Sequence, residues 1–215
     1  LEMKYMTAKE EDILTNTNYI TKGIVLDKLL ESLIVSKINY NDIIVGDKNA
    51  LLIAARVLGY GKDYEFSYGG EVISVDLTTL NDKNLNPKDL AEEGINEFEF
   101  SLPSSKNTIT FKLLTHGDEK SIDRELQGLK KIRKDIIPEA TTRLKYMITS
   151  IDGDREKKTI REFVDTYLLA RDARALREEI RRVSPDVELK YYGDDVEEAI
   201  TIPVDLTFFW PDAQL

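Results

Sequence analysis

The stretch Tyr64-Glu65-Phe66-Ser67-Tyr68-Gly69-Gly70-Glu71-Val72-Ile73-Ser74-Val75 decides the fold, because the hydrophobic pattern changes there from helical to alternating. Apolar and polar residues alternate on both sides of Gly69-Gly70, and glycines can adopt the positive φ angles that a tight hairpin turn requires. The stretch therefore predicts an antiparallel β-hairpin. Since helical patterns precede it, the chain is expected to combine helices with antiparallel strands.

Residues 1–62 are predicted to form an N-terminal helical segment. Thr7 and Glu10 have capping-box spacing, which predicts a short helix ending at Leu14. Apolar residues then recur at the spacing of one broad helix face: Ile24, Val25, Leu26, Leu29, Leu30, Leu33 and Ile34. Asp47 is expected to cap a further helix that Gly59 ends.

The remaining chain is predicted to divide into three further segments. Residues 63–117 hold antiparallel hairpins, because 97–102 and 108–113 also alternate. Residues 118–185 form a charged helical section, and 186–215 form a C-terminal hairpin and an aromatic tail.

The helical section is expected to contain three helices, whose charges alternate in sign as on solvated, ion-paired faces. Asp118 caps the first, which runs until Pro138, and the second covers about 139–150. The third opens near Asp154 and runs through Leu168; it either ends there or continues as far as Ser184-Pro185. The predicted class is α+β, with the C-terminal aromatic strand returning to the sheet. The four segments form either one compact unit or two small subdomains.

Composition excludes several kinds of site. The 215 residues include no cysteine and one histidine, which excludes disulfides, a cysteine nucleophile, thiolate-bound metal and a two-histidine zinc site. The formal net charge is −10, which argues against a general phosphate-binding surface. No run of about 18 apolar residues and no signal-peptide core occurs, so a cytosolic protein without membrane association is expected.

The charge is distributed unevenly along the chain. Residues 118–184 contain 17 basic and 14 acidic residues, whereas the rest contains 13 and 26. A basic cluster lies in this section, at Lys130, Lys131, Arg133 and Lys134. A nucleic-acid-binding module through 118–184 is therefore an alternative, although the absence of interleaved aromatic residues favours a solvated helix face.

Candidate catalytic and metal-binding residues are poorly supported. Asp152-Gly153-Asp154 begins like a calcium loop, but Lys157 and Phe163 stand where that loop needs glycine and a bidentate glutamate, so a turn is favoured. His116 would need serine and aspartate partners that a sequence cannot place.

Carboxylate pairs leave a second alternative, a carboxylate-based hydrolase. The pairs are Glu92-Glu93 and Glu97 with Glu99. A chain with 40 acidic residues supplies such pairs by chance. We therefore expect a protein that is not an enzyme, with no catalytic residue, no metal and no cofactor.

Near its C-terminus the chain has three large aromatic residues followed by a proline, Phe208-Phe209-Trp210-Pro211. In a strand, Phe208 and Trp210 point to one face and Phe209 to the other. Either both faces are covered and the rings are core, or one face docks on a partner protein, because exposed aromatic rings concentrate interface energy. Phe208, Phe209 and Trp210 are the candidate partner-binding residues.

Five parts of the chain together carry a resemblance to a known family. They are Met6–Leu14, Lys22-Gly23 with Leu26–Leu30, Ile43–Leu52 with Arg56 and Gly59-Tyr60-Gly61, Val75-Asp76-Leu77, and Phe208–Pro211. In this combination the chain resembles the T4-type baseplate hub assembly proteins of contractile-tailed bacteriophages. The resemblance covers about 1–115 and the last 30 residues.

The resemblance implies a role in building the baseplate hub around the central tube, as a hub component or as a hub assembly chaperone. Such a protein acts by binding other baseplate hub or tape-measure proteins and binds neither nucleic acid nor membrane; its oligomeric state is left open. It would be found in the host cytoplasm during assembly and, as a hub component, in the tail baseplate of the virion. Some relatives carry paired cysteines in the hairpin turns, but the corresponding turns here, 68–70 and 192–194, have no thiol.

Overall fold

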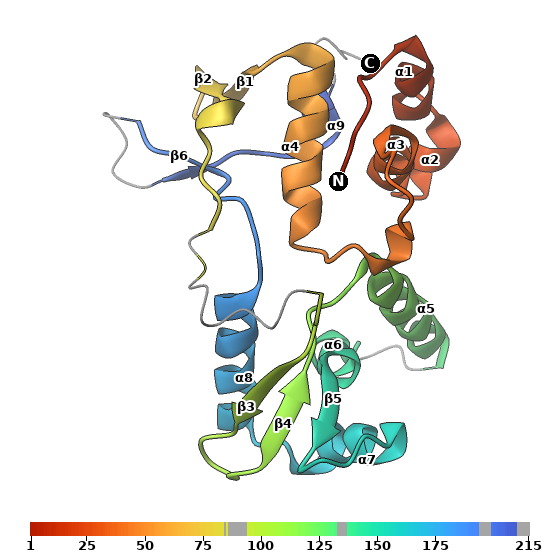
Figure 1. Ribbon diagram of the computed structural model, residues 1–215, viewed down its shortest axis with the longest axis vertical. Helices are drawn as coiled ribbons and strands as arrows, with labels where there is room; N and C mark the ends of the chain where they lie inside the picture. Colours follow the sequence, from red (N-terminus) through yellow and green to blue (C-terminus); the bar gives the residue numbers. More distant parts are fainter. Residues whose placement is uncertain (84, 86–93, 133–136, 194–198, 210–215) are drawn as a thin grey trace. The chain divides into compact units, whose positions relative to one another are not determined.

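The computed structural model describes residues 1–83, 85, 94–132, 137–193 and 199–209 (Figure 1). The chain divides into two compact units. Unit 1 contains residues 1–38, 46–83 and 186–215, and unit 2 contains residues 39–45 and 84–185. Both combine helices with antiparallel strands, which confirms the α+β class.

The units cut across the segments expected from the sequence, and they differ in charge. The hairpin over 63–76 belongs to unit 1, whereas the second alternating pair belongs to unit 2. Unit 1 contains 10 basic and 20 acidic residues, whereas unit 2 contains 20 of each. The whole net charge of −10 therefore belongs to unit 1.

The described part of unit 1 begins with helices: α1 (Ala8–Leu14), α2 (Thr17–Thr21), α3 (Val25–Leu33) and α4 (Asp47–Tyr60). The predicted capping box is present, with the Glu10 carboxylate accepting from the Thr7 amide at 2.9 Å. Helix α4 continues past Gly59 and ends at Gly61, whose φ of 88° requires glycine. Gly59 instead permits close packing, because a Cβ there would lie 2.6 Å from the Met6 sulfur.

The strands of unit 1 form two separate hairpins. They are β1 (Asp63–Tyr68) with β2 (Glu71–Asp76), and β6 (Lys190–Tyr191) with β7 (Ile200–Thr201). Gly69 and Gly70 have φ angles of 61° and 91°, which confirms the turn predicted from the sequence. Tyr64 and Phe66 on β1 are buried, and the short helix η2 (Leu77–Thr79) follows β2.

The predicted C-terminal aromatic strand is wrong for residues 206–209, which form the short helix α9 (Leu206–Phe209). Strand pairing ends at Thr201, close before Pro203, which has no N–H to donate to a ladder. The Asp205 carboxylate then accepts from the Thr207 amide at 2.8 Å, a side-chain-to-backbone bond typical of a helix start. Trp210 and Pro211 lie outside the described residues.

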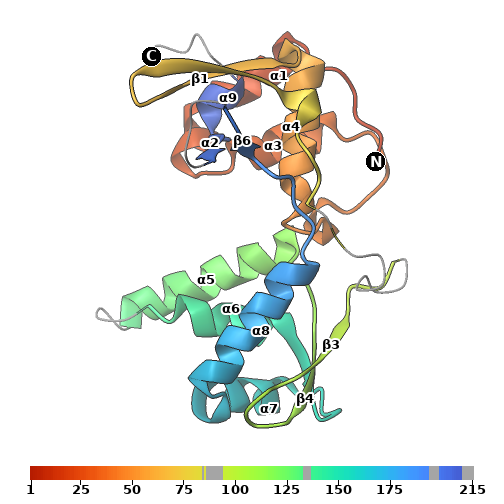
Figure 2. The ribbon, with the colours of Figure 1, turned by 90° about the vertical axis from the view of Figure 1, so that its left-hand side faces the viewer.

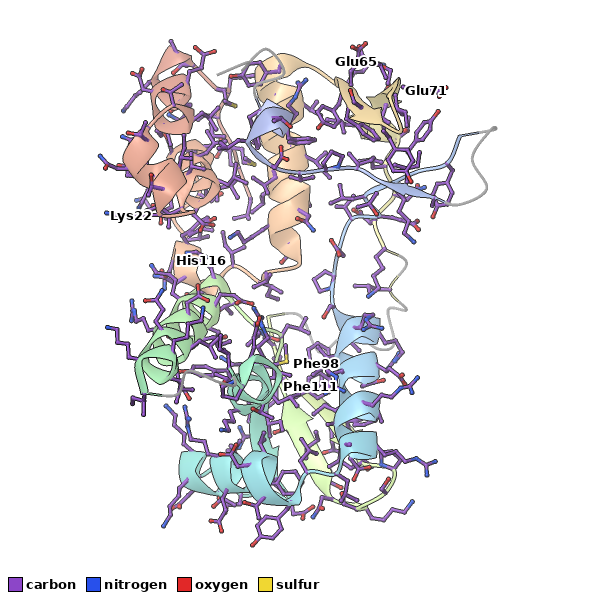
Figure 3. All side chains as sticks on the ribbon, turned by 180° about the vertical axis from the view of Figure 1, so that it is seen from behind. Lys22, Glu65, Glu71, Phe98, Phe111 and His116 are labelled. Atoms are coloured by element: carbon purple, nitrogen blue, oxygen red, sulfur yellow. The ribbon has the colours of Figure 1, made fainter. Side chains whose placement is uncertain are left out.

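Unit 2 contains a three-stranded antiparallel sheet in the order β3 (Phe98–Ser101), β4 (Thr108–Phe111), β5 (Ile148–Ile151). The rings of Phe98 and Phe111 are register partners and stack with centroids 5.4 Å apart (Figure 3). The short helix η1 (Tyr40–Asp42) also belongs to this unit. Two of these strands were predicted, whereas β5 was expected to be the end of a helix over 139–150.

The helices of unit 2 are α5 (His116–Ile132), α6 (Glu139–Met147), α7 (Lys157–Glu162), the π-helical turn η4 (Phe163–Tyr167) and α8 (Ala170–Val183). The expected cap of the first of these helices, Asp118, is wrong, because Asp118 lies within α5. Thr115 precedes α5 instead, and its hydroxyl accepts from the Asp118 amide at 3.3 Å. The helix expected from near Asp154 through Leu168 is present as α7 and η4. It does not continue to Ser184, because the backbone leaves the helical region at Leu168 and Leu169.

Figure 2 shows α6, α7 and α8 around the sheet of unit 2, and one apolar core joins these helices to the sheet. Ile109 and Phe111 of β4 pack with Leu144 of α6 and with Leu176 and Ile180 of α8. Within the described parts of the chain, no helix has the length and apolar character needed to cross a bilayer.

Candidate functional site

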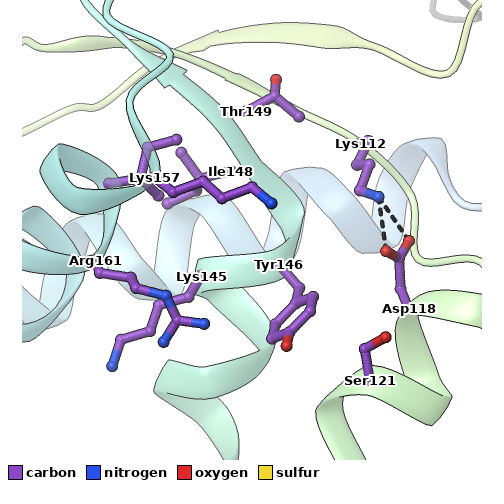
Figure 4. Close-up of a pocket in the computed structure, with 10 residues that line it drawn as sticks. Lys112, Asp118, Ser121, Lys145, Tyr146, Ile148, Thr149, Lys157 and Arg161 are labelled. Atoms are coloured by element: carbon purple, nitrogen blue, oxygen red, sulfur yellow. Dashed lines mark hydrogen bonds and ion pairs between the residues drawn. The ribbon is translucent and has the colours of Figure 1, made fainter. Parts of the chain in front are cut away.

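A pocket of about 480 Å³ lies within unit 2 (Figure 4). Four cationic side chains line it, together with one carboxylate, Asp118, and the Tyr146 ring. The cations are Lys112, Lys145, Lys157 and Arg161. We call the pocket, with all the residues that line it, the basic pocket.

A β-bulge shapes one wall of the basic pocket. Thr110 of β4 is paired with Ser150, but the next residue, Phe111, is paired with Ile148, so Thr149 is an extra residue in β5. A bulge interrupts the strict alternation of side chains between two faces. Consequently the adjacent Ile148 and Thr149 both line the pocket.

The Lys112–Asp118 ion pair holds a second wall. The Asp118 carboxylate accepts from Lys112 Nζ at 2.8 and 2.7 Å and from the Thr115 amide at 3.0 Å. Because Lys112 follows β4 and Asp118 lies in the first turn of α5, the pair fixes the start of this helix beside the sheet.

Glu125 connects three helices at the third wall. Its carboxylate accepts two bonds from the Arg161 guanidinium, at 2.8 and 2.7 Å, and one from the Tyr146 hydroxyl at 3.0 Å. The bonds from Arg161 outweigh burial and lower the pKa of Glu125, while burial and the bond to Glu125 raise the pKa of Tyr146. A bidentate pair of this kind restricts both the position and the orientation of Arg161.

The two remaining lysines differ in their partners. Lys145, whose side chain is 10% exposed, forms an ion pair with Asp165 of η4 at 2.6 Å. Lys157 lies along Ile148 with its ammonium group directed over the pocket (Figure 4). In the described part of the chain, the ammonium group of Lys157 forms no hydrogen bond or ion pair.

This arrangement can bind an anion. The lining contains Ser121 and Thr149 hydroxyls, but both already donate, to the Gly117 carbonyl and to Glu97 respectively. Among the described residues, no group of three or more His, Asp or Glu could hold a metal ion. The cationic side chains of the basic pocket can therefore attract and hold an anion by their charge.

The structure assigns the other sequence candidates to local roles. His116 is buried at the start of α5, with its ring 4.7 Å from that of Tyr40. The Asp152 carboxylate accepts from Asn107 and from the Thr108 amide, and Asp154 accepts from the Glu156 amide. The calcium-like segment is thus a turn between β5 and α7, as predicted.

The acidic and basic clusters are only partly described. Glu97 forms a bidentate ion pair with Arg155, and Glu99 is exposed on β3. Lys130 and Lys131 lie in the last turn of α5. Glu92, Glu93, Arg133 and Lys134 lie outside the described residues.

The candidate partner-binding residues Phe208 and Phe209 are not at the surface. Both side chains are 0% exposed, and the Phe208 ring lies 4.8 Å from Tyr64 and 5.3 Å from Phe209, in edge-to-face arrangements. These rings belong to the core of unit 1, the other reading that the sequence left open. Trp210 lies outside the described residues.

Sequence reasoning missed the basic pocket. The charged helix faces were expected to be solvated and ion-paired, and Glu125–Arg161 and Lys145–Asp165 are such pairs. One signal was present, because Lys157 and Arg161 are four residues apart and share a helix face. No family model matches the chain, and neither does any curated protein or solved structure.

Proposed function

We propose that this protein acts in the assembly of a phage baseplate hub, as a hub component or as a hub assembly chaperone, by binding other tail proteins. One observation supports the proposal more than any other. Most of the segments that carry the resemblance to the T4-type hub assembly proteins belong to unit 1, namely 6–14, 22–23, 26–30, 46–52 with 56 and 59–61, 75–77 and 208–209, whereas 43–45 belong to unit 2. Most of these segments, although distant in sequence, thus belong to one folded body, as expected if the resemblance reflects a shared fold.

Charge gives the proposal a further support. Unit 1 contains 20 acidic and 10 basic residues, so its field attracts basic surfaces and repels nucleic acid. Complementary charge increases association rates and selects partners. We therefore expect the partner of unit 1 to present a basic surface, and the role requires no catalytic residue.

The test is co-expression of the full chain with the tail genes that neighbour it, followed by affinity capture. We expect one hub or tape-measure protein to be retained with fixed stoichiometry, and a capsid protein from the same phage, as the control, to be absent. Retention should fall when ionic strength rises from 0.1 to 0.5 M, because the Debye length shortens to below about 5 Å. Capture of no tail protein would refute the proposal.

A second measurement separates the two versions of the role. Mass spectrometry of purified virions should detect the chain if it is a hub component. Its absence from virions, together with capture of a tail protein during co-expression, would identify an assembly chaperone.

A further inference from the structure

We propose that the basic pocket of unit 2 is a binding site for an oxyanion, supplied by an acidic segment of a partner protein or by a phosphate compound. This site is separate from the charge-based partner binding of unit 1 and does not rest on the function proposed above. The inference depends on the balance of charge, on Lys157 and on the fixed positions of the neighbouring donors.

Cationic groups outnumber anionic ones around the pocket. Four cationic side chains line it against the single carboxylate of Asp118. Two further carboxylates, Glu125 and Asp165, each pair with one of these cations without lining the pocket. Counting all seven groups leaves one positive charge, and an oxyanion in the pocket would compensate it.

Lys157 supplies that uncompensated charge. Its ammonium group ends over the pocket, and the described chain gives it no hydrogen-bond or ion-pair partner (Figure 4). Lys112, Lys145 and Arg161 each have a carboxylate partner. A lysine ammonium group can donate three hydrogen bonds. Because those of Lys157 are not used by a described residue, we expect an oxyanion to contact Lys157 directly.

The rest of the pocket is already ordered. Glu125 holds both Arg161 and Tyr146, and Asp118 holds Lys112 with two bonds. Side chains that are fixed before binding lose little entropy when a ligand arrives. The volume of about 480 Å³ lies within the range of small-ligand sites, roughly 300–1,000 Å³, and admits a carboxylate side chain or a phosphate group.

The chain provides a matched control beside the key residue. Lys158 follows Lys157 in the first turn of α7; both side chains are exposed, but only Lys157 lines the pocket. Lys157→Ala and Lys158→Ala remove the same charge from adjacent positions. A difference between the two variants therefore reports the pocket and not the general charge of the surface.

The experiment measures binding of fluorescein-labelled hexaglutamate to the full chain by anisotropy at low salt, with inorganic phosphate titrated in parallel by calorimetry. We expect at least one probe to bind, Lys157→Ala to weaken it about tenfold, and Lys158→Ala to change it less than twofold. Circular dichroism confirms that each variant is folded.

The two probes also distinguish the source of the oxyanion. Tighter binding of hexaglutamate indicates an acidic partner segment, tighter binding of phosphate indicates a phosphate compound, and either result supports the site. The proposal is wrong if neither probe binds, or if the two alanine variants weaken binding equally.

Discussion

Replacing Asp172 by alanine is expected to destabilise unit 2 by about 2–5 kcal/mol. The Asp172 side chain is 0% exposed in the first turn of α8, and it accepts from the Ser104 amide at 2.7 Å and from the Ser105 amide at 2.9 Å. Alanine leaves both amides without this acceptor, and a buried, unsatisfied donor costs about 1–3 kcal/mol. The loop between β3 and β4 would thereby lose its attachment to α8.

The effect should depend on pH in one direction. Burial would raise the pKa of Asp172, but the hydrogen bonds from Ser104 and Ser105 together outweigh it and lower the pKa below its usual value. The stabilisation is therefore complete above the unfolded-state pKa of about 3.9 and is lost as the pH falls through the lower folded-state value. The difference between wild type and Asp172→Ala should be constant near pH 7 and shrink below about pH 4.

Hydrogen exchange followed by mass spectrometry in increasing urea is the suitable assay, because a chain with two units need not unfold in one transition. Amides of α8 and of the loop 103–107 should lose protection at lower urea in the variant. Glu178→Ala is the matched control, since Glu178 lies on the same helix in an exposed pair with Arg174 worth about 0.5 kcal/mol or less. Equal protection of α8 in the two variants would refute the reasoning.

Three further changes concern unit 1. Phe208→Ala should lower the free energy of unfolding of unit 1 by about 3–5 kcal/mol, because the ring is fully buried. Faster hydrogen exchange of the β1 amides should report this loss; unchanged exchange would mean that the ring is not part of the core. Glu10→Ala should cost about 2 kcal/mol at pH 7 by urea unfolding, since the buried carboxylate accepts from Lys4, Thr7 and Ser32. Those bonds outweigh burial and lower the pKa of Glu10 far below its usual value, so the cost should begin to shrink below about pH 4 and fall further as the pH approaches the folded-state pKa; a cost at pH 3 equal to that at pH 7 would contradict this assignment. Arg56→Lys should cost about 1–2 kcal/mol in thermal unfolding, because lysine cannot donate to the Gly61 and Asp63 carbonyls with one planar group; an unchanged midpoint would argue against that double contact.

Locally coded elements were predictable from the sequence. The β1–β2 hairpin follows from two glycines between alternating segments, and its turn has the expected positive φ angles. The capping box at Thr7 and Glu10 is equally local. In both places a few adjacent residues determine the backbone conformation, so contacts with distant residues are not needed to predict it.

Elements that depend on distant partners were not predictable. Residues 148–151 follow the helical pattern of Leu144 and Met147, yet they form β5. Their backbone pairs with β4, and Ile148 and Ile151 are buried in the core of unit 2. Strand preference is largely a matter of such context. The turn at Leu168 and Leu169 likewise separates two helices that the sequence pattern joins.

The basic pocket was hidden for the same reason. Its cations come from positions 112, 145, 157 and 161, and only the last two are close enough in sequence to share a helix turn. The carboxylates that hold them, such as Glu125, belong to other elements. The sequence shows that these residues are charged, but only the folded sheet of unit 2, with its bulge in β5, brings them together in one pocket.

The discontinuity of unit 1 affects how the chain is made. Tyr64 leaves the ribosome early, but its hydroxyl donates to the Pro203 carbonyl, 139 residues later, and its ring is covered by Phe208. At synthesis rates of about 5–20 residues per second, that delay is roughly 7–30 seconds. During this interval the apolar face of the β1–β2 hairpin lacks its cover, so the nascent chain is open to chaperones or to premature association. Only translation through residue 209 provides the aromatic rings that close unit 1.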